Sequence, residues 1–184
     1  VSALGGITDQ LLKAAHLALE AGEEYMEVYQ AIRCRHMDMV NTLITNPTTR
    51  QMLCLELEGI LDELRSILFG VHLVKDLSDK TEAAIVSYGE RMSSRIVTAA
   101  LPGAVRKNSL QFIRTEHKQG QVLLNTELTE QLIRHAFSPM PHLSVVPGFI
   151  SRDSQTDEIT NLGRGGSDYT ASILAATLNA EVLE

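Results

Sequence analysis

Hydrophobic residues in the first hundred positions recur every three or four residues, which is the spacing of one face of an α-helix. Four helices are predicted: from an N-cap at Thr8-Asp9 onward, over about 23–43, over about 49–69, and from Ser78-Asp79 to about Pro102. We expect the third helix to end at Gly70. It carries a strong apolar stripe made of Leu53, Leu57, Ile60, Leu61, Leu64, Ile67 and Leu68.

The second half of the chain has shorter hydrophobic runs. The pattern predicts a strand at 110–114, a helix from Thr126 to about His135, a buried parallel strand over 143–150 that ends at Pro147-Gly148, a polar hairpin over 151–161 and a helix over 168–178. Strands that alternate with helices favour an α/β layered fold with a central, mostly parallel sheet. The helical stretch over about 23–100 would then be a long insertion.

Composition narrows the function classes. Hydrophobic residues make up 44% of the 184 residues, so a sizeable core is feasible. The net charge of -7 argues against general affinity for nucleic acid or anionic membranes. No apolar run approaches the roughly 20 residues of a membrane span, so we expect a cytoplasmic enzyme. Cys34 and Cys54 are expected to pack in the core, and the histidines show no paired spacing, so no metal site is predicted.

The densest candidate site is the run Gly163-Arg164-Gly165-Gly166-Ser167-Asp168, a glycine-rich turn that leads into the last predicted helix. Such a turn lets the backbone approach a ligand, and the helix start offers free N–H groups and a positive dipole end to an anion. It is not a Walker A loop, because no Lys follows the glycines. A plain turn with Ser167 as N-cap is the structural alternative.

Three acidic or basic residues are candidates for chemistry. The guanidinium of Arg164 suits bidentate capture of a carboxylate or phosphate. Asp168 could compensate the helix dipole or orient a substrate amine. Glu90 could receive a substrate ammonium, or it could stand with Arg91 on an exposed helix face. A second glycine turn at Gly5-Gly6 has the same strand-turn-helix logic as the first.

Four blocks of the sequence resemble the motifs of aspartokinases, in that family's order. They are Ser2-Ala3-x-x-Gly6-Ile7-Thr8, Ser87-x-Gly89-Glu90-x-Met92-Ser93, Gly148-Phe149-Ile150 and Leu162-Gly163-Arg164-Gly165-Gly166-Ser167-Asp168-Tyr169-Thr170. The resemblance covers essentially the whole chain, and the last block is close to diagnostic within the amino acid kinase superfamily. Residues 64–74 also resemble the helical insert of aspartokinases, including those fused to homoserine dehydrogenase.

The resemblance implies phosphorylation of the L-aspartate side chain by ATP with Mg²⁺, giving aspartyl 4-phosphate, the first step of lysine, threonine and methionine biosynthesis. By matching motif position, Arg164 and Glu90 would hold the carboxylate and ammonium of aspartate. Asp168 would organise the reaction centre. Ser2, Thr8, Phe149 and Ser167 would line the pocket, and Gly163, Gly165 and Gly166 would lie near the phosphates. The resemblance also implies a homo-oligomer.

Parts of the family pattern are absent from this sequence. The Lys-Phe-Gly-Gly-Thr block, the nucleotide-binding block and the regulatory domains do not occur. We therefore expect a partial amino acid kinase domain over 1–184, incomplete at both ends and inactive by itself. Glutamate, acetylglutamate and uridylate kinases are alternatives within the superfamily. A ligand-binding or oligomerising module without catalysis is the alternative outside it.

Overall fold

The computed structural model describes residues 1–118 and 120–184, which form two compact units. The helical unit comprises Ala3–Pro102, and the α/β unit comprises Val1–Ser2 and Gly103–Glu184. Each unit has its own buried core.

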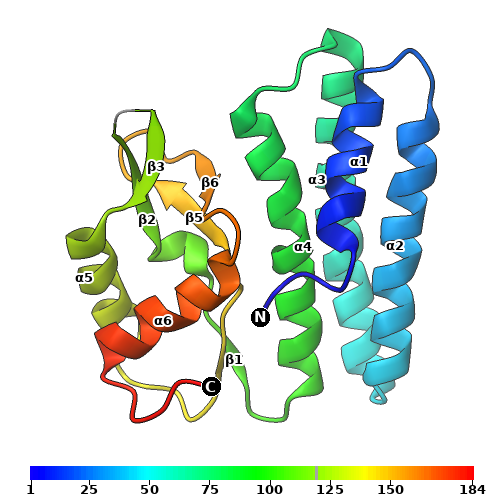
Figure 1. The fold of residues 1–184 in the computed structure, drawn as a ribbon. Coiled ribbons are helices and arrows are strands. Elements are labelled where there is room, and N and C mark those ends of the chain that lie inside the picture. Colours follow the sequence, from blue (N-terminus) through cyan, green and yellow to red (C-terminus); the bar gives the residue numbers. More distant parts are fainter. Residues whose placement is uncertain (119) are drawn as a thin grey trace. The chain divides into compact units, whose positions relative to one another are not determined.

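The helical unit contains α1 (Ile7–Ala18), α2 (Glu24–Leu43), α3 (Pro47–Val74) and α4 (Asp79–Ala100), which run side by side (Figure 1). The predicted apolar stripe of α3 is buried apart from Ile67, which is half-buried. Its leucines share the core with residues from the other helices: Leu11, Ile32, Ile85, Met92 and Ile96 are almost completely inaccessible to solvent. The side-chain oxygens of Asn46 and Ser78 accept backbone N–H groups at the starts of α3 and α4. The predicted helices are thus confirmed in number and approximate extent.

Two helix boundaries differ from prediction. The helix α1 begins at Ile7 after Gly6, whose left-handed φ of 79° turns the chain, so the predicted N-cap at Thr8-Asp9 is wrong. The helix α3 does not end at Gly70. It continues because Val71 is buried in the core, and it ends at Val74, followed by the C-cap Lys75 with a left-handed φ of 56°. Burial of one valine can outweigh the cost of about 1 kcal/mol for a glycine inside a helix.

The α/β unit contains β1 (Val105–Arg106), the short 3₁₀ helix η1 (Ser109–Gln111), β2 (Arg114–Lys118), β3 (Gln121–Leu124), α5 (Thr126–Ala136), β4 (Ser144–Val145), β5 (Ile150–Asp153), β6 (Ile159–Asn161) and α6 (Gly166–Leu178). Its core gathers Phe112, Ile113, Ile133, Phe137 and Ile173, with the two phenylalanine rings edge to face at 5.7 Å. In Figure 1, α5 and α6 lie close to each other within this unit, and they are in contact.

The sheet confirms the α/β class. The order is β3-β2-β5-β6, in which the central pair β2–β5 is parallel and both outer pairs are antiparallel, and β1 pairs with β4 in parallel. The strand predicted at 110–114 is displaced, because the side chain of Asn108 accepts the N–H of Leu110 and closes a 3₁₀ turn there. The strand β3 was not expected.

The strand predicted over 143–150 is divided into β4 and β5, with Pro147 and Gly148 between them. The predicted hairpin over 151–161 is confirmed and is formed by β5 and β6. Hydrogen-bonded hydroxyls of Thr115, Ser151 and Thr160 lie buried beneath it.

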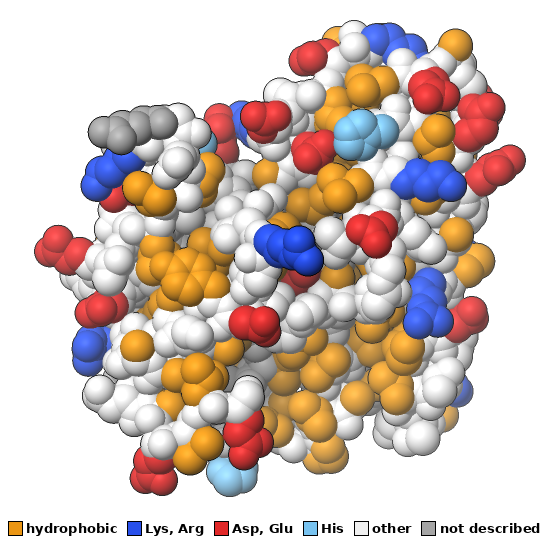
Figure 2. Space-filling model, in the orientation of Figure 1, with side chains coloured by type: hydrophobic (Ala, Val, Ile, Leu, Met, Phe, Trp, Pro, Cys, Tyr) orange, Lys and Arg blue, Asp and Glu red, His pale blue; other side chains and the backbone are white. Residues whose placement is uncertain are grey.

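Hydrophobic side chains lie among charged ones of both signs on the face drawn in Figure 2. Cys34 is exposed and Cys54 is half-buried, so the expectation that both pack in the core is wrong for Cys34. None of the helices within the described residues combines the length and the apolar character that a membrane span requires.

Candidate functional site

The glycine-rich turn before α6 has the backbone that its sequence requires. Gly163 and Gly165 have left-handed φ values of 71° and 75°, and the N–H of Gly166 donates to the carbonyl of Gly163 at 3.0 Å. Gly165 is the N-cap, so the alternative with Ser167 in that position is wrong. Among the described residues, no acceptor binds the N–H groups of Ser167 and Asp168, which leaves both amides available to an anion.

The segment at Gly148 and Phe149 packs directly against this turn. A Cβ on Gly148 would lie 2.7 Å from the Cα of Ser167, and a Cβ on Gly166 would lie 2.9 Å from the ring of Phe149. Only glycine fits such approaches. Phe149 itself has a left-handed φ of 64°. A non-glycine residue in this region is strained, and such strain often occurs at functional sites.

Thr170 holds the strained segment in place. Its hydroxyl accepts the N–H of Phe149 at 3.1 Å and donates to the carbonyl of Gly166 at 2.8 Å. The N–H of Leu162 also donates to the carbonyl of Phe149 at 2.8 Å. Phe149, Gly166 and Ser167 are therefore brought together and fixed by hydrogen bonds.

The charged residues of the turn face solvent. Arg164 and Asp168 are both exposed, and within residues 1–118 and 120–184 no ion-pair partner holds the guanidinium of Arg164. Ser2 is also exposed and follows Val1, whose carbonyl accepts the N–H of Gly148 at 2.9 Å. The α/β unit thus presents a cation, an anion and free backbone amides along one turn.

In the helical unit, Glu90 is a buried carboxyl group on α4. It is only 3% exposed, so the alternative of an exposed Glu90–Arg91 face is wrong. Its Oε1 accepts the N–H of Ala3 at 3.2 Å, whereas its Oε2 has no hydrogen-bond partner among the residues that the structure describes. Burial raises the pKa of Glu90 to about 7, although the Ala3 N–H bond partly opposes this shift.

The neighbouring Gly89 allows α4 to approach the segment that precedes α1. A Cβ there would lie 2.7 Å from the Cβ of Ala3 and 3.5 Å from a methyl group of Ile7. Thr8 follows in the first turn of α1 and is half-buried. Glu90 is therefore placed by close packing against the residues that begin α1.

Two groups that hold Glu90 and Phe149 in place are not among the residues predicted from the sequence. The backbone N–H of Ala3 gives no sequence signal, because every residue except proline carries one. Thr170 has a weak signal: it follows Gly166 by four residues, the spacing at which a helical threonine can bond back to the preceding turn.

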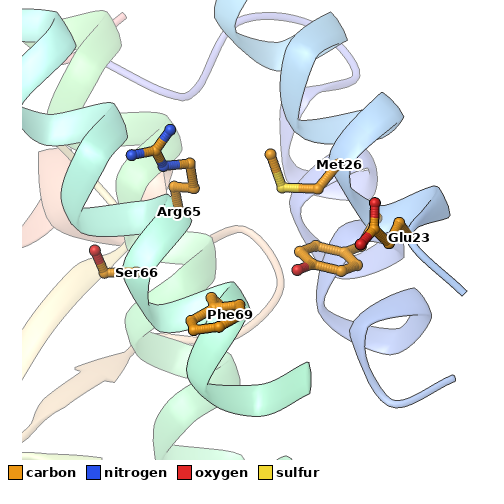
Figure 3. A pocket seen from close by; sticks show the side chains of 6 residues that line it. Glu23, Met26, Arg65, Ser66 and Phe69 are labelled. Carbon is orange, nitrogen blue, oxygen red and sulfur yellow. The ribbon is translucent and has the colours of Figure 1, made fainter. Parts of the chain in front are cut away.

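Other parts of the described chain offer less chemistry. No group of three or more His, Cys, Asp or Glu residues with metal-binding geometry occurs among the described residues. A surface pocket of about 440 Å³ lies in the helical unit (Figure 3). It is lined by Arg65, Ser66 and Phe69 of α3 and by Glu23, Tyr25 and Met26 at the start of α2. None of the predicted site residues lines this pocket.

Comparison with known proteins identifies relatives over the whole chain. The family model described as the amino acid kinase family matches residues 1–184. Aspartokinase 1, chloroplastic, from Arabidopsis thaliana is 28% identical over 195 residues, which cover 100% of this chain but 33% of that protein. The chain thus spans about a third of the length of this curated relative.

Solved structures agree with the sequence match. E. coli aspartokinase III in complex with lysine and aspartate (T-state) has a TM-score of 0.84 and 28% identity, covering 97% of this chain and 40% of that chain. The same enzyme in complex with aspartate and ADP (R-state) has a TM-score of 0.83 and 27% identity, covering 97% and 39%. These matches confirm the resemblance that the four sequence blocks indicate.

Proposed function

Since the chain belongs to the amino acid kinase family, we propose that it is the aspartate-binding part of an aspartate kinase. The reaction is the transfer of the γ-phosphoryl group of ATP to the side-chain carboxylate of L-aspartate, which yields aspartyl 4-phosphate for lysine, threonine and methionine biosynthesis. The observation that carries the proposal is the buried Glu90, whose Oε2 accepts no hydrogen bond from any described residue. The similar E. coli aspartokinase III binds aspartate and ADP, which supports it.

Glu90 receives the ammonium group of aspartate. A buried carboxylate without a counter-charge is costly, and an incoming cation reduces that cost by pairing with the unsatisfied oxygen, Oε2. Arg164 binds the α-carboxylate through its planar guanidinium, which is exposed and unpaired among the described residues. By their position in the family's motifs, Ser2, Thr8, Phe149 and Ser167 are the further residues that we propose for aspartate binding.

The turn before α6 serves the phosphoryl group. The free amides of Ser167 and Asp168 point from a helix N-terminus, a place that favours anions, and Gly163, Gly165 and Gly166 leave space for a close approach. The aspartate carboxylate attacks the γ-phosphorus while the bond to the β-phosphate oxygen breaks. The attacking group is already ionised at neutral pH, so the protein supplies position and charge neutralisation rather than proton transfer.

The residues present fit Mg²⁺ that is held mainly by the nucleotide. Mg²⁺ commonly binds through one or two carboxylates together with substrate phosphates, and Asp168 offers one exposed carboxylate beside the amides of the turn. When bound, the ion neutralises phosphate charge. Asp168 is the residue of this chain that would hold it and thereby organise the reaction centre.

The buried Glu90 also helps to distinguish among the alternative substrates. Acetylglutamate carries an amide in place of the ammonium group, so it would leave the carboxylate of Glu90 without a counter-charge. Glutamate keeps the ammonium and differs only by one methylene, which distinguishes substrates weakly. A module that binds ligand without catalysis is favoured only if this chain, joined to a Lys-Phe-Gly-Gly-Thr block and a nucleotide-binding block, proves inactive.

The proposal is tested by calorimetric titration of the 184-residue chain with L-aspartate and N-acetyl-L-aspartate. We expect L-aspartate to bind and the acetylated analogue to fail. Arg164→Ala should weaken L-aspartate binding by about 2–4 kcal/mol, because one partner of a charged hydrogen-bonded pair is lost. The control is Arg134→Ala, an exposed arginine on α5 that should leave affinity unchanged. Equal affinities for Arg164→Ala and the unaltered chain would refute the assigned role.

The chain by itself should bind aspartate without forming aspartyl 4-phosphate, because the lysine of the Lys-Phe-Gly-Gly-Thr block is not part of it. Kinase activity is expected of a protein that combines this chain with such a block and a nucleotide-binding block. A homo-oligomeric state and a cytoplasmic location stay predictions, and the relative from Arabidopsis thaliana is a chloroplastic protein.

A further inference from the structure

The outer face of α3, opposite its buried stripe, carries large hydrophobic side chains that face solvent. Met52, Leu55, Phe69 and Leu73 are 67%, 69%, 51% and 66% exposed. They share one face with the smaller residues Gly59, Asp62 and Ser66, because successive members of the set are three or four residues apart. We call these seven residues the outer stripe of α3. Such a stripe on a 28-residue helix is typical of a surface that packs against another helix.

The small residues of the outer stripe leave room for a partner. Nothing lies within 4 Å of the place where a Cβ of Gly59 would stand. Phe69, by contrast, projects its ring from the helix beside Ser66 (Figure 3). Gly59 therefore forms a gap, and Phe69 forms a projection on the same face.

The charges near the outer stripe leave one pair available. Glu56, Glu58 and Glu63 are each paired inside the helical unit, with arginines from α2 or α4. Asp62 instead contacts Arg65 of its own helix at 3.7 Å, and both side chains are more than half exposed. Surface pairs of this kind contribute little, so both groups can exchange partners at small cost.

We propose that the outer stripe of α3 is a self-association surface, on which a second copy of this chain packs its own α3 in antiparallel orientation. The two-fold axis crosses the contact at the height of Leu64 along α3, so that residues equally far before and after position 64 face each other between the two copies. Each Phe69 ring then lies over Gly59 of the other copy, and each Leu55 meets Leu73. Large residues face small or hydrophobic ones along the whole contact.

The same axis brings opposite charges together. Asp62 of each copy lies about 1.5 Å along the helix axis from Arg65 of the other copy, on the same flank of the pair. Two ion pairs therefore form across the contact, symmetrically about its centre. Charge complementarity of this kind fixes the register of paired helices.

A substitution at Gly59 separates association from folding. Gly59→Leu fills the gap that receives Phe69, but it meets open space in the single chain and replaces glycine with a better helix former. We expect the dimer to weaken at least tenfold in sedimentation velocity while the melting temperature of the monomer rises. The control is Asn41→Leu, which places the same side chain at an exposed position of α2 and not on the outer stripe of α3.

Charge reversal identifies the pairing directly. Arg65→Asp and Asp62→Arg should each weaken self-association, because like charges then meet across the two-fold axis. A mixture of these two variants should form heterodimers, detected by native mass spectrometry, because all the pairs between copies are then opposite in sign. If Asp62 and Arg65 interacted only within one helix, mixing the variants would not restore association, because each variant has lost that intrahelical ion pair.

A contact of one helix pair is small, so association is measured at roughly 10–100 μM chain. A chain that stays monomeric throughout this range overturns the proposal. Dimers that are unaffected by Gly59→Leu, or variants that do not prefer each other, overturn it as well. None of these measurements involves aspartate or ATP, so the result stands apart from the proposed kinase function.

Discussion

Glu90 is the residue with the most perturbed environment of the proposed site. Its carboxyl group is buried and its pKa is raised to about 7, mainly by that burial. An ammonium beside it would favour the ionised form and lower the pKa again. Because the pKa of Glu90 is higher in the folded chain than in the unfolded chain, protonation of this group favours the folded state. Its contribution to the free energy of unfolding is fully present below the unfolded pKa and is lost as the pH rises through about 7.

Aspartate binding should therefore depend on pH. At pH 6 most Glu90 side chains are protonated and must lose a proton to pair with the ligand, so the affinity should be about tenfold lower than at pH 8. Calorimetry in buffers of different ionisation enthalpy should show proton release near pH 6 and almost none at pH 8. Glu90→Gln should remove this dependence. A wild-type affinity that is constant from pH 6 to 8 would contradict the role of Glu90.

The sequence predicts the backbone role of the glycines better than it predicts the burial of Glu90. The glycines of the turn before α6 require unusual backbone angles or close approach, and the structure shows both. For Glu90 the sequence left a buried and an exposed interpretation open. The choice depends on α4 packing against Ala3 and Ile7, residues that lie more than eighty positions away in the chain. Contacts of that range leave no local pattern.

At the scale of elements, periodicity located the helices but not their ends. The boundary at Gly70 was wrong because the buried face of α3 extends to Val71, and tertiary packing overrides a local stop signal. The strands were predicted less well. The strand β3 is exposed over most of its length, so it lacks the hydrophobic alternation that identifies a strand in sequence.

The packing of Gly148 against the start of α6 is an element contact that can be tested. Gly148→Ala places a Cβ 2.7 Å from the Cα of Ser167, and backbone cannot move aside as a flexible side chain can. We expect a loss of about 1–3 kcal/mol in unfolding free energy, measured by urea denaturation, together with weaker aspartate binding. Gly70→Ala is the control. It meets open space within α3 and should increase stability by about 0.5–1 kcal/mol.

Unchanged stability of Gly148→Ala would show that α6 tolerates displacement at its start. Destabilisation by Gly70→Ala would show that Gly70 needs a conformation closed to alanine, as the sequence-based prediction of a helix end implied. Gly148→Ala therefore tests the packing against the start of α6, whereas Gly70→Ala tests whether α3 continues through Gly70.

At the scale of the whole molecule, the two units differ in how the chain forms them. The helical unit is one continuous segment, whereas the α/β unit is assembled from the first two residues and the last part of the chain. The hydrophobic pattern predicts a helical insertion over about 23–100, and the compact helical unit extends over Ala3–Pro102. The assignment of α1 to this unit could not be predicted, because it depends on contacts of α1 with α2 and α4.

A continuous unit with its own core should fold without the rest of the chain. The core of the helical unit is formed by side chains from α1 to α4, and its contacts join helices that are close in sequence, which favours rapid two-state folding. We expect a peptide of residues 3–102 to give a helical circular dichroism spectrum and one cooperative thermal transition. Leu61→Ala should lower its unfolding free energy by about 2–5 kcal/mol, because Leu61 is fully buried, while Leu55→Ala on the exposed side of α3 should change it little. A gradual melt with equal effects of the two substitutions would show that the helices need the α/β unit to form a core.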